Sequence, residues 1–192
     1  STYLFFREKE ARTEQERLKL QADRARDNES KLRQKAEYRE LVAQAAVQVG
    51  YGQTEEADRL LARVPVELAP PSLEAARAYT RVGEWHVTAG RGREATDRCA
   101  AAALSLATVD PSDSDAISLN LIPAAATLSQ SGDRGRYDRL RTIALERFKN
   151  TSHPLVAEQI VKSSLLMPAD ERIHAALDPM AAFLMTSINE RH

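Results

Sequence analysis

The spacing of apolar and charged residues divides the chain into two parts near residue 40. Residues 7–49 contain neither proline nor glycine, and half of the first 40 positions are charged, with 11 basic and 9 acidic side chains. Such a run predicts one continuous helix of about 65 Å, at ~1.5 Å per residue. From residue 41 onward, shorter apolar-periodic segments alternate with glycine and proline, which predicts a series of short helices.

One apolar seam runs along the first part, at every seventh position: Leu4, Ala11, Leu18, Ala25 and Leu32. The positions three residues further on are polar throughout: Arg7, Glu14, Gln21, Asn28 and Lys35. A two-stranded coiled coil requires both positions to be apolar. Two interpretations therefore remain open, a partner-dependent coiled coil that allows self-association and a single solvated helical arm. Acids alternate with bases, so no nucleic-acid partner is expected.

The chain opens with the apolar residues 3–6, which charged residues follow directly. This patch is either incidental or the last turn of a transmembrane helix whose first part lies outside the sequence. The longest uninterrupted apolar runs, residues 99–104 and 180–185, are far shorter than the ~20 residues that a membrane span needs. No membrane insertion by this chain is expected, and residues 1–40 are interpreted as a charged, juxtamembrane-type helical arm.

The second part, residues 41–192, contains regular helix start and stop signals. Capping residues are expected at Thr54, Ser72, Asp133 and Asp170. The predicted helices are 41–49, 54–64, 73–89, 93–107, one that Pro111 opens and Gly132 ends, 133–148, 153–167, and a last one that Pro179 interrupts. Pro123 falls inside the fifth of them and is expected to bend it.

Three turn glycines recur at a nearly constant interval. Gly52, Gly90 and Gly132 are 38 and 42 residues apart, and each lies between two predicted helices. Two helices in each period of this length indicate an α-solenoid, in which every hairpin buries its apolar face against the next. The predicted fold is therefore all-α, a long N-terminal helix followed by a solenoid of helix hairpins.

Composition and charge agree with closely packed helices. The chain is 43% hydrophobic, 29% charged and only 5% aromatic, and its formal net charge is −1. The near-neutral balance gives no general attraction to nucleic acid. A single cysteine excludes a disulfide framework and a cysteine-built zinc site within the chain.

The sequence contains no recognisable catalytic, cofactor-binding or metal-binding motif. Its four histidines form no His-x3-His pair, and Glu171-x2-His174 alone is too common to indicate a metal site. Cys99 is expected to be a buried, inert thiol. The Gly50–Gly52 and Gly90–Gly92 segments lack the preceding strand and third glycine of a phosphate loop, so they are expected to be turns. We expect a protein that is not an enzyme.

The best-defined hairpin resembles the tetratricopeptide repeat, because small and apolar residues stand at the spacing of that family. The residues that carry the match are Tyr79, Val82, Gly83, Gly90, Ala95, Cys99 and Ala102. Gly83 and Ala95 are expected where the two helices press together, with the larger side chains packed around them. The match departs from the family in having His86 where an aromatic residue is usual. Residues 38–70 and 117–152 match less well, and residues 153–190 keep only the two-helix outline.

At the level of the whole chain, the sequence resembles the C-terminal region of bacterial membrane-anchored serine/threonine protein kinases. Residues 81–90, 119–126 and 156–170 carry this resemblance. It implies a parent protein with a kinase domain, a single membrane span, a charged helical arm and a degenerate tetratricopeptide-like domain. It also implies that catalysis belongs to a part outside this sequence. For the location of this region, the resemblance favours the extracytoplasmic side of the membrane. None of the kinase motifs is present.

The repeat resemblance further implies a binding groove lined by the first helix of each hairpin. The residues expected to face this groove are Arg77, Thr80, Glu84, Thr88, Leu119 and Ile122. Thr80 and Glu84 stand where a clamp for a peptide carboxylate would need other side chains, so no recognition of a chain terminus is expected. The expected partner is a protein or peptide bound without catalysis or cofactor. The alternative is a structural arm for dimerisation or spacing that has no specific ligand.

Overall fold

A computed structural model describes residues 2–106 and 114–189, with side chains at residues 12, 14–106 and 120–187. All regular elements in these ranges are helices, and no strand occurs among them. The prediction of an all-α fold is therefore confirmed. The chain separates into two compact units that divide between Glu37 and Tyr38.

The first unit consists of the N-terminal part of a single long helix, α1 (Thr2–Gly50). The long helix predicted over residues 7–49 is confirmed, and it begins five residues earlier. Every described side chain from residue 12 to residue 37 is exposed. Ion pairs such as Arg17–Glu14 and Arg33–Glu29, each 2.6 Å long, join successive turns. Pairs of this kind stabilise an exposed helix by about 0.2–0.5 kcal/mol each.

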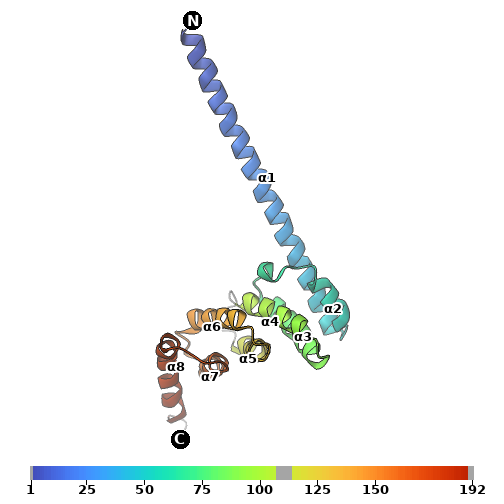
Figure 1. Cartoon of the computed structure of the whole chain (residues 1–192), viewed down its shortest axis with the longest axis vertical. Coiled ribbons are helices and arrows are strands. Elements are labelled where there is room, and N and C mark those ends of the chain that lie inside the picture. Colours follow the sequence, from blue (N-terminus) through green and yellow to red (C-terminus); the bar gives the residue numbers. More distant parts are fainter. Residues whose placement is uncertain (1, 107–113, 190–192) are drawn as a thin grey trace. The chain divides into compact units, whose positions relative to one another are not determined.

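The second unit begins with residues 38–50 of α1 and continues as helices joined by short connections (Figure 1). The elements are α2 (Thr54–Leu61), a short 3-10 helix η1 (Val66–Leu68), α3 (Leu73–Thr88), α4 (Gly92–Leu106), α5 (Ser114–Gln130), α6 (Arg134–Phe148), α7 (Pro154–Ser164) and α8 (Glu171–Asn189). Helices α3 and α4 pack closely as a hairpin, as do α7 and α8. Contacts of α4 with α5, and of α5 with α7, join each hairpin to the next.

The three turn glycines adopt the backbone conformation that the sequence pattern requires. Gly52, Gly90 and Gly132 have φ angles of 75°, 70° and 72°, in the left-handed region that a side chain disfavours. The amide of Gln53 donates to the carbonyl oxygen of Gln48, and the amide of Arg91 donates to that of His86, each at 2.9 Å. These bonds satisfy carbonyl groups at the ends of the two helices. The predicted turns between helices are confirmed.

The predicted helix starts are confirmed at three of four positions. The Ser72 hydroxyl accepts a hydrogen bond from the Ala75 amide at 3.1 Å, and the carboxylates of Asp133 and Asp170 cap α6 and α8 in the same way. The prediction for Thr54 is wrong. Gln53 is the residue before α2, without a side-chain bond to the helix, because Thr54 already has helical geometry.

Several predicted helix limits are also wrong. Helix α8 continues through Pro179 instead of being interrupted there, since a proline removes only one backbone donor and packing can keep the helix intact. Helix α7 ends at Ser164, three residues earlier than predicted, and η1 is an element that the sequence did not indicate. Pro123 lies inside α5 as expected. Pro111 lies outside the described residues.

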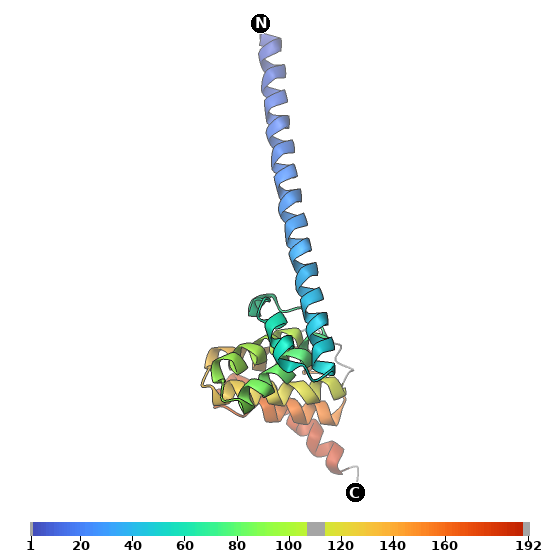
Figure 2. The same ribbon diagram turned by 90° about the vertical axis from the view of Figure 1, so that its right-hand side faces the viewer.

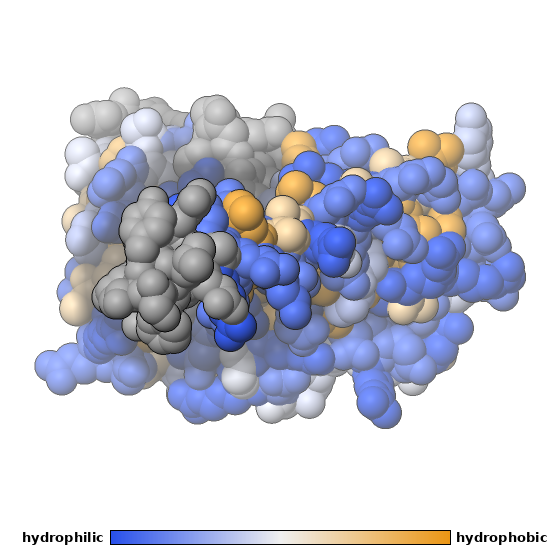
Figure 3. Space-filling view, turned by 90° about the horizontal axis from the view of Figure 1, so that it is seen from above, coloured by the Kyte–Doolittle hydropathy of each residue, from blue (hydrophilic) through white to orange (hydrophobic). Residues whose placement is uncertain are grey.

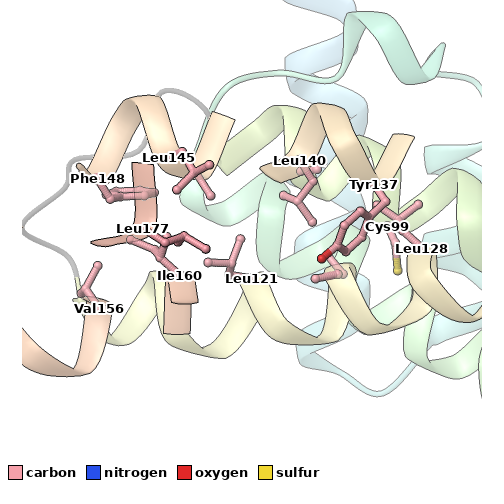
Figure 4. Packing of buried hydrophobic residues seen from close by; sticks show 14 of the residues in the cluster. Cys99, Leu121, Leu128, Tyr137, Leu140, Leu145, Phe148, Val156, Ile160 and Leu177 are labelled. Carbon is pink, nitrogen blue, oxygen red and sulfur yellow. The ribbon is translucent and has the colours of Figure 1, made fainter. Parts of the chain in front are cut away.

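Helix α4 is buried on more than one side and contributes to two apolar clusters. Ala101 and Ala102 pack with residues of α1, α2 and α3, while Cys99, Ala100 and Ala103 pack with residues of α5 to α8. Short side chains allow neighbouring helices to approach from several sides at once. Figure 4 shows the second cluster, where Tyr137, Leu128 and Cys99 meet at one end and Phe148, Leu177 and Ile160 at the other. Figure 2 shows the second unit from another side, with the helices from α3 onward coloured green to red.

Candidate functional site

The residues expected to pack the best repeat are buried between α3 and α4. Tyr79, Val82, Ala95, Cys99 and Ala102 are each at most 1% exposed, and Gly83 is buried with them. The seventh, Gly90, forms the turn. A Cβ atom at Gly83 would lie 2.9 Å from the Cys99 Sγ and 3.6 Å from the Ala95 carbonyl oxygen. The two helices therefore meet where Gly83 and Ala95 were expected to touch.

The residues expected to line a groove on the first helices are less uniform. Arg77 and Thr88 are exposed, Glu84 and Ile122 are partly exposed, and the side chain of Leu119 lies outside the described residues. Glu84 forms an ion pair with Arg81 at 3.3 Å. Thr80 is only 4% exposed, so its expected position in an open groove is wrong. The cause is that α3 contacts α2, α4 and α5 and so buries more than one face.

A partly buried carboxylate joins three helices of the second unit. The Oδ1 atom of Asp58 on α2 accepts a hydrogen bond from the Nε of Arg98 on α4 at 2.8 Å. The Nε2 of His86 on α3 lies 3.0 Å from the same Oδ1 atom. Burial alone would raise the pKa of Asp58, but the bonding side chains of His86 and Arg98 and the charge of Arg98 outweigh it and lower this pKa. The cluster joins α2, α3 and α4, while the Nδ1 of His86 is buried without a hydrogen-bond partner in the described structure.

The same kind of contact recurs one hairpin further on. Arg136 of α6 donates to Asp97 of α4 at 2.6 Å, so that an arginine again reaches back to an aspartate of the preceding second helix. The two aspartates, Asp58 and Asp97, are 39 residues apart, which is close to the intervals between the turn glycines. Sequence reasoning missed both contacts.

Between α6 and α8, Asp138 pairs instead with Arg134 and Arg141 of its own helix, and a groove of about 550 Å³ lies there. Its apolar part is formed by Leu145, Ile173, Ala176 and Pro179. Charged and polar side chains also line it: Asp138, Arg141, Thr142, Glu146, Lys149, Asn150, Asp170 and Arg172. None of the residues expected from the repeat resemblance lines this groove.

Two side chains of α6 fix the connection between α7 and α8 and thereby one end of the groove. The Tyr137 hydroxyl donates to the Ser163 carbonyl oxygen at 2.6 Å and accepts from the Met167 amide at 3.3 Å. Arg141 donates to the carbonyl oxygens of Ser164 and Pro168 at 3.3 and 3.4 Å. The side chain of Tyr137 is fully buried, at 0% exposure, and its hydroxyl bonds to the next hairpin.

A second, more polar cavity of about 790 Å³ lies beside η1, α4 and α6. Its lining includes three acidic side chains, Glu67, Asp97 and Asp133, and three arginines, Arg93, Arg136 and Arg139. Arg136 is already paired with Asp97, and Asp133 caps α6. The three acidic side chains and the three arginines balance, so the charges of this cavity favour neither sign of ion. Where Figure 3 shows the molecular surface, polar residues predominate and the apolar ones form small separate groups.

Two candidate nucleophiles, Cys99 and Tyr79, are buried and protonated. Burial raises the pKa of Cys99 to about 11 and that of Tyr79 to about 12, so both remain neutral near pH 7. Within the described ranges, no group of three or more His, Cys, Asp or Glu residues is placed to hold a metal ion.

Comparison with family models, with curated proteins and with solved structures gives no match for this chain. Among the described helices, none combines the length and the apolar character needed to cross a bilayer.

Proposed function

We propose that this chain is a non-catalytic helical-repeat module that binds a protein or a peptide. The observation that carries the proposal is the groove between α6 and α8, which combines an apolar floor with charged and polar side chains. Apolar area supplies affinity in such sites, while a few polar groups at the rim select the partner. A volume of about 550 Å³ is sufficient for several side chains of a bound segment.

A solenoid of degenerate tetratricopeptide-like hairpins is the architecture that we propose for the second unit. Three features support it: the interval between the left-handed turn glycines, the recurring contact from arginine to aspartate between second helices, and the contacts of α3 with α5 and of α5 with α7. Modules of this kind present extended faces to protein partners. The resemblance noted in the sequence supports placing the module in the sensory or scaffold region of a receptor-type serine/threonine kinase.

Dimerisation through the N-terminal helix is the second candidate, and one observation favours it. Leu18 and Leu32 of α1 both belong to the seam that repeats every seven residues. Their side chains are 53% and 66% exposed. Leucines in this arrangement gain stability when another helix covers them. In this alternative the chain sets the spacing of a larger protein and has no specific ligand.

Selection of random 12-residue peptides on the full chain tests the proposed function. Peptides that survive selection are then titrated by isothermal calorimetry. We expect saturable binding of one peptide per chain, with a Kd in the micromolar range that is typical of short segments. If no selected peptide binds more tightly than about 1 mM, the proposed function is wrong.

A further inference from the structure

The apolar part of the groove between α4 and α6 is filled by the chain itself, while the polar cavity of about 790 Å³ stays open beside it. Val66 of η1 packs against both apolar clusters, and Val66 and Glu67 border a remaining space of only about 40 Å³. Ala103 of α4 and Leu140 of α6 border the same space. A short segment with one apolar and one acidic side chain therefore occupies the junction of two successive second helices.

The groove between α6 and α8 is the equivalent place one hairpin later. There, no part of the described chain takes the position of η1, and the groove remains open at about 550 Å³. Asp138 and Arg172 line it from α6 and α8. Asp138 pairs only with arginines of its own helix, Arg134 and Arg141, so among the described residues no ion pair crosses the groove.

Arg172 is the charged side chain at the rim that can pair with an acidic group of the occupant. The groove is lined by three acidic and three basic side chains, so its charges balance. Asp138 pairs with Arg141 and Asp170 caps α8, whereas Arg172 forms no ion pair among the described residues. In the filled groove, Glu67 lies by the same space as two arginines of α6, Arg136 and Arg139. A carboxylate near Arg172 would complete the corresponding arrangement, because arginine binds carboxylates with strong, directed hydrogen bonds.

The dimensions suit a short segment. From Asp138 to Lys149, α6 extends for about 16 Å at 1.5 Å per residue. An extended peptide covers this length with about five residues at ~3.3 Å each. The bonds of Tyr137 and Arg141 to the connection between α7 and α8 hold the groove in shape before anything binds, which reduces the entropic cost of binding.

We propose that the groove between α6 and α8 binds a short segment of a partner protein in which an apolar side chain stands next to a carboxylate. This inference rests on the proposed function and names the chemistry of the partner. The apolar side chain contacts Leu145, Ile173 and Ala176. The carboxylate pairs with Arg172, as Glu67 lies by arginines one hairpin earlier.

Peptide selection on the full chain, with two matched variants, tests this inference. The selected 12-residue peptides are labelled with fluorescein, and their affinity is measured by fluorescence polarisation. Ala176→Arg places a long charged side chain in the groove, whereas Ala175→Arg places the same side chain at an exposed neighbouring position outside it. Thermal melting by circular dichroism verifies that both variants are folded.

We expect the selected peptides to share an apolar residue beside Asp or Glu. Their affinity should fall at least tenfold on Ala176→Arg and remain unchanged on Ala175→Arg. On Arg172→Glu the affinity should again fall at least tenfold, and it should recover when the acidic residue of the peptide is replaced by lysine.

Three other results are distinguishable. Peptides that bind Ala176→Arg as tightly as the unsubstituted chain would overturn the assignment of the groove, while the proposed function would stand. Binding that depends on Ala176 but not on Arg172 would overturn the requirement for a carboxylate. If no peptide binds the chain at all, the proposed function is wrong and this inference fails with it.

Discussion

The Nε of Arg98 lies 2.8 Å from the Oδ1 of Asp58, although 40 positions separate the two residues in the chain. Arg98 is only 9% exposed, so its positive charge has lost most of its contact with water. The carboxylate of Asp58 replaces that solvation and connects α2 to α4. A charge held in this way depends strongly on its partner, since an unpaired buried charge is costly.

Removing the negative charge of Asp58 should destabilise the protein more than removing that of Asp97. We expect Asp58→Asn to lower the free energy of unfolding by about 3 kcal/mol, because it leaves Arg98 buried without a counter-charge. Asp97→Asn should cost less than about 1 kcal/mol, because Asp97 and Arg136 remain about one-third exposed to water. Urea denaturation measures both losses. Equal losses would show that the burial of Arg98 is energetically irrelevant.

The contribution of Asp58 to stability should disappear in acid. The pKa of this carboxyl is lowered in the folded state from its usual 3.8, so the unfolded chain takes up the proton at a higher pH than the folded chain. The contribution is therefore complete above the unfolded pKa and is lost as the pH falls below 3.8 and through the lower folded pKa. The difference in unfolding free energy between the unsubstituted chain and Asp58→Asn should shrink as the pH falls below 4. A difference that grows in acid would contradict the assigned direction.

The contact of α3 with α4 at Gly83 leaves no room for a methyl group. Gly83→Ala should destabilise the protein by about 1–3 kcal/mol, since the new Cβ would lie 2.9 Å from the Cys99 Sγ. Adding Cys99→Ala should recover part of this loss, because it removes the clashing sulfur. Gly135→Ala is the control, since its nearest neighbour would be an ordinary 3.8 Å away. Thermal denaturation compares the stability of the unsubstituted chain and the three variants. If Gly83→Ala leaves the stability unchanged, α3 and α4 lie further apart at this position.

The hairpin organisation was predictable because it depends on local signals. Gly52, Gly90 and Gly132 mark turns that need a left-handed residue, and Ser72 and Asp133 mark helix starts that need a side-chain acceptor. Each signal acts within a few residues of its position in the chain. The expected contact at Gly83 followed in the same way from a short pattern of small residues.

The groove between α6 and α8 was not predictable in this way. It depends on where α8 lies relative to α6, which long-range contacts of Tyr137 and Arg141 determine across 23 to 30 positions of the chain. A local pattern carries no information on such contacts. The repeat resemblance implied a groove on the first helix of each hairpin, whereas the apolar groove lies between α6 and α8. Thr80 illustrates the same limit, since its burial results from three neighbouring helices.

The hydroxyl of Tyr137 should matter for both stability and the groove. Tyr137→Phe removes a bond to the Ser163 carbonyl oxygen and one from the Met167 amide, and should cost about 1–2 kcal/mol of unfolding free energy. Tyr51→Phe removes a hydroxyl from a residue that is 76% exposed and should change nothing measurable. Urea denaturation compares the two variants. An equal effect of both would show that the connection between α7 and α8 is held without Tyr137.

The oligomeric state of the full chain separates the two candidate functions. Leu18→Glu with Leu32→Glu replaces two leucines of the apolar seam, while Leu20→Glu changes an equally exposed leucine outside it. Leucine and glutamate have similar helix propensities, so α1 should remain helical in both variants. We expect sedimentation equilibrium to give a monomer for each, since Gln21 and Asn28 place polar groups where a coiled coil needs a second apolar row. If the alternative holds, the unsubstituted chain is a dimer. Each buried leucine then contributes about 1.5–3 kcal/mol, and the double substitution weakens association by more than about a thousandfold while Leu20→Glu does not.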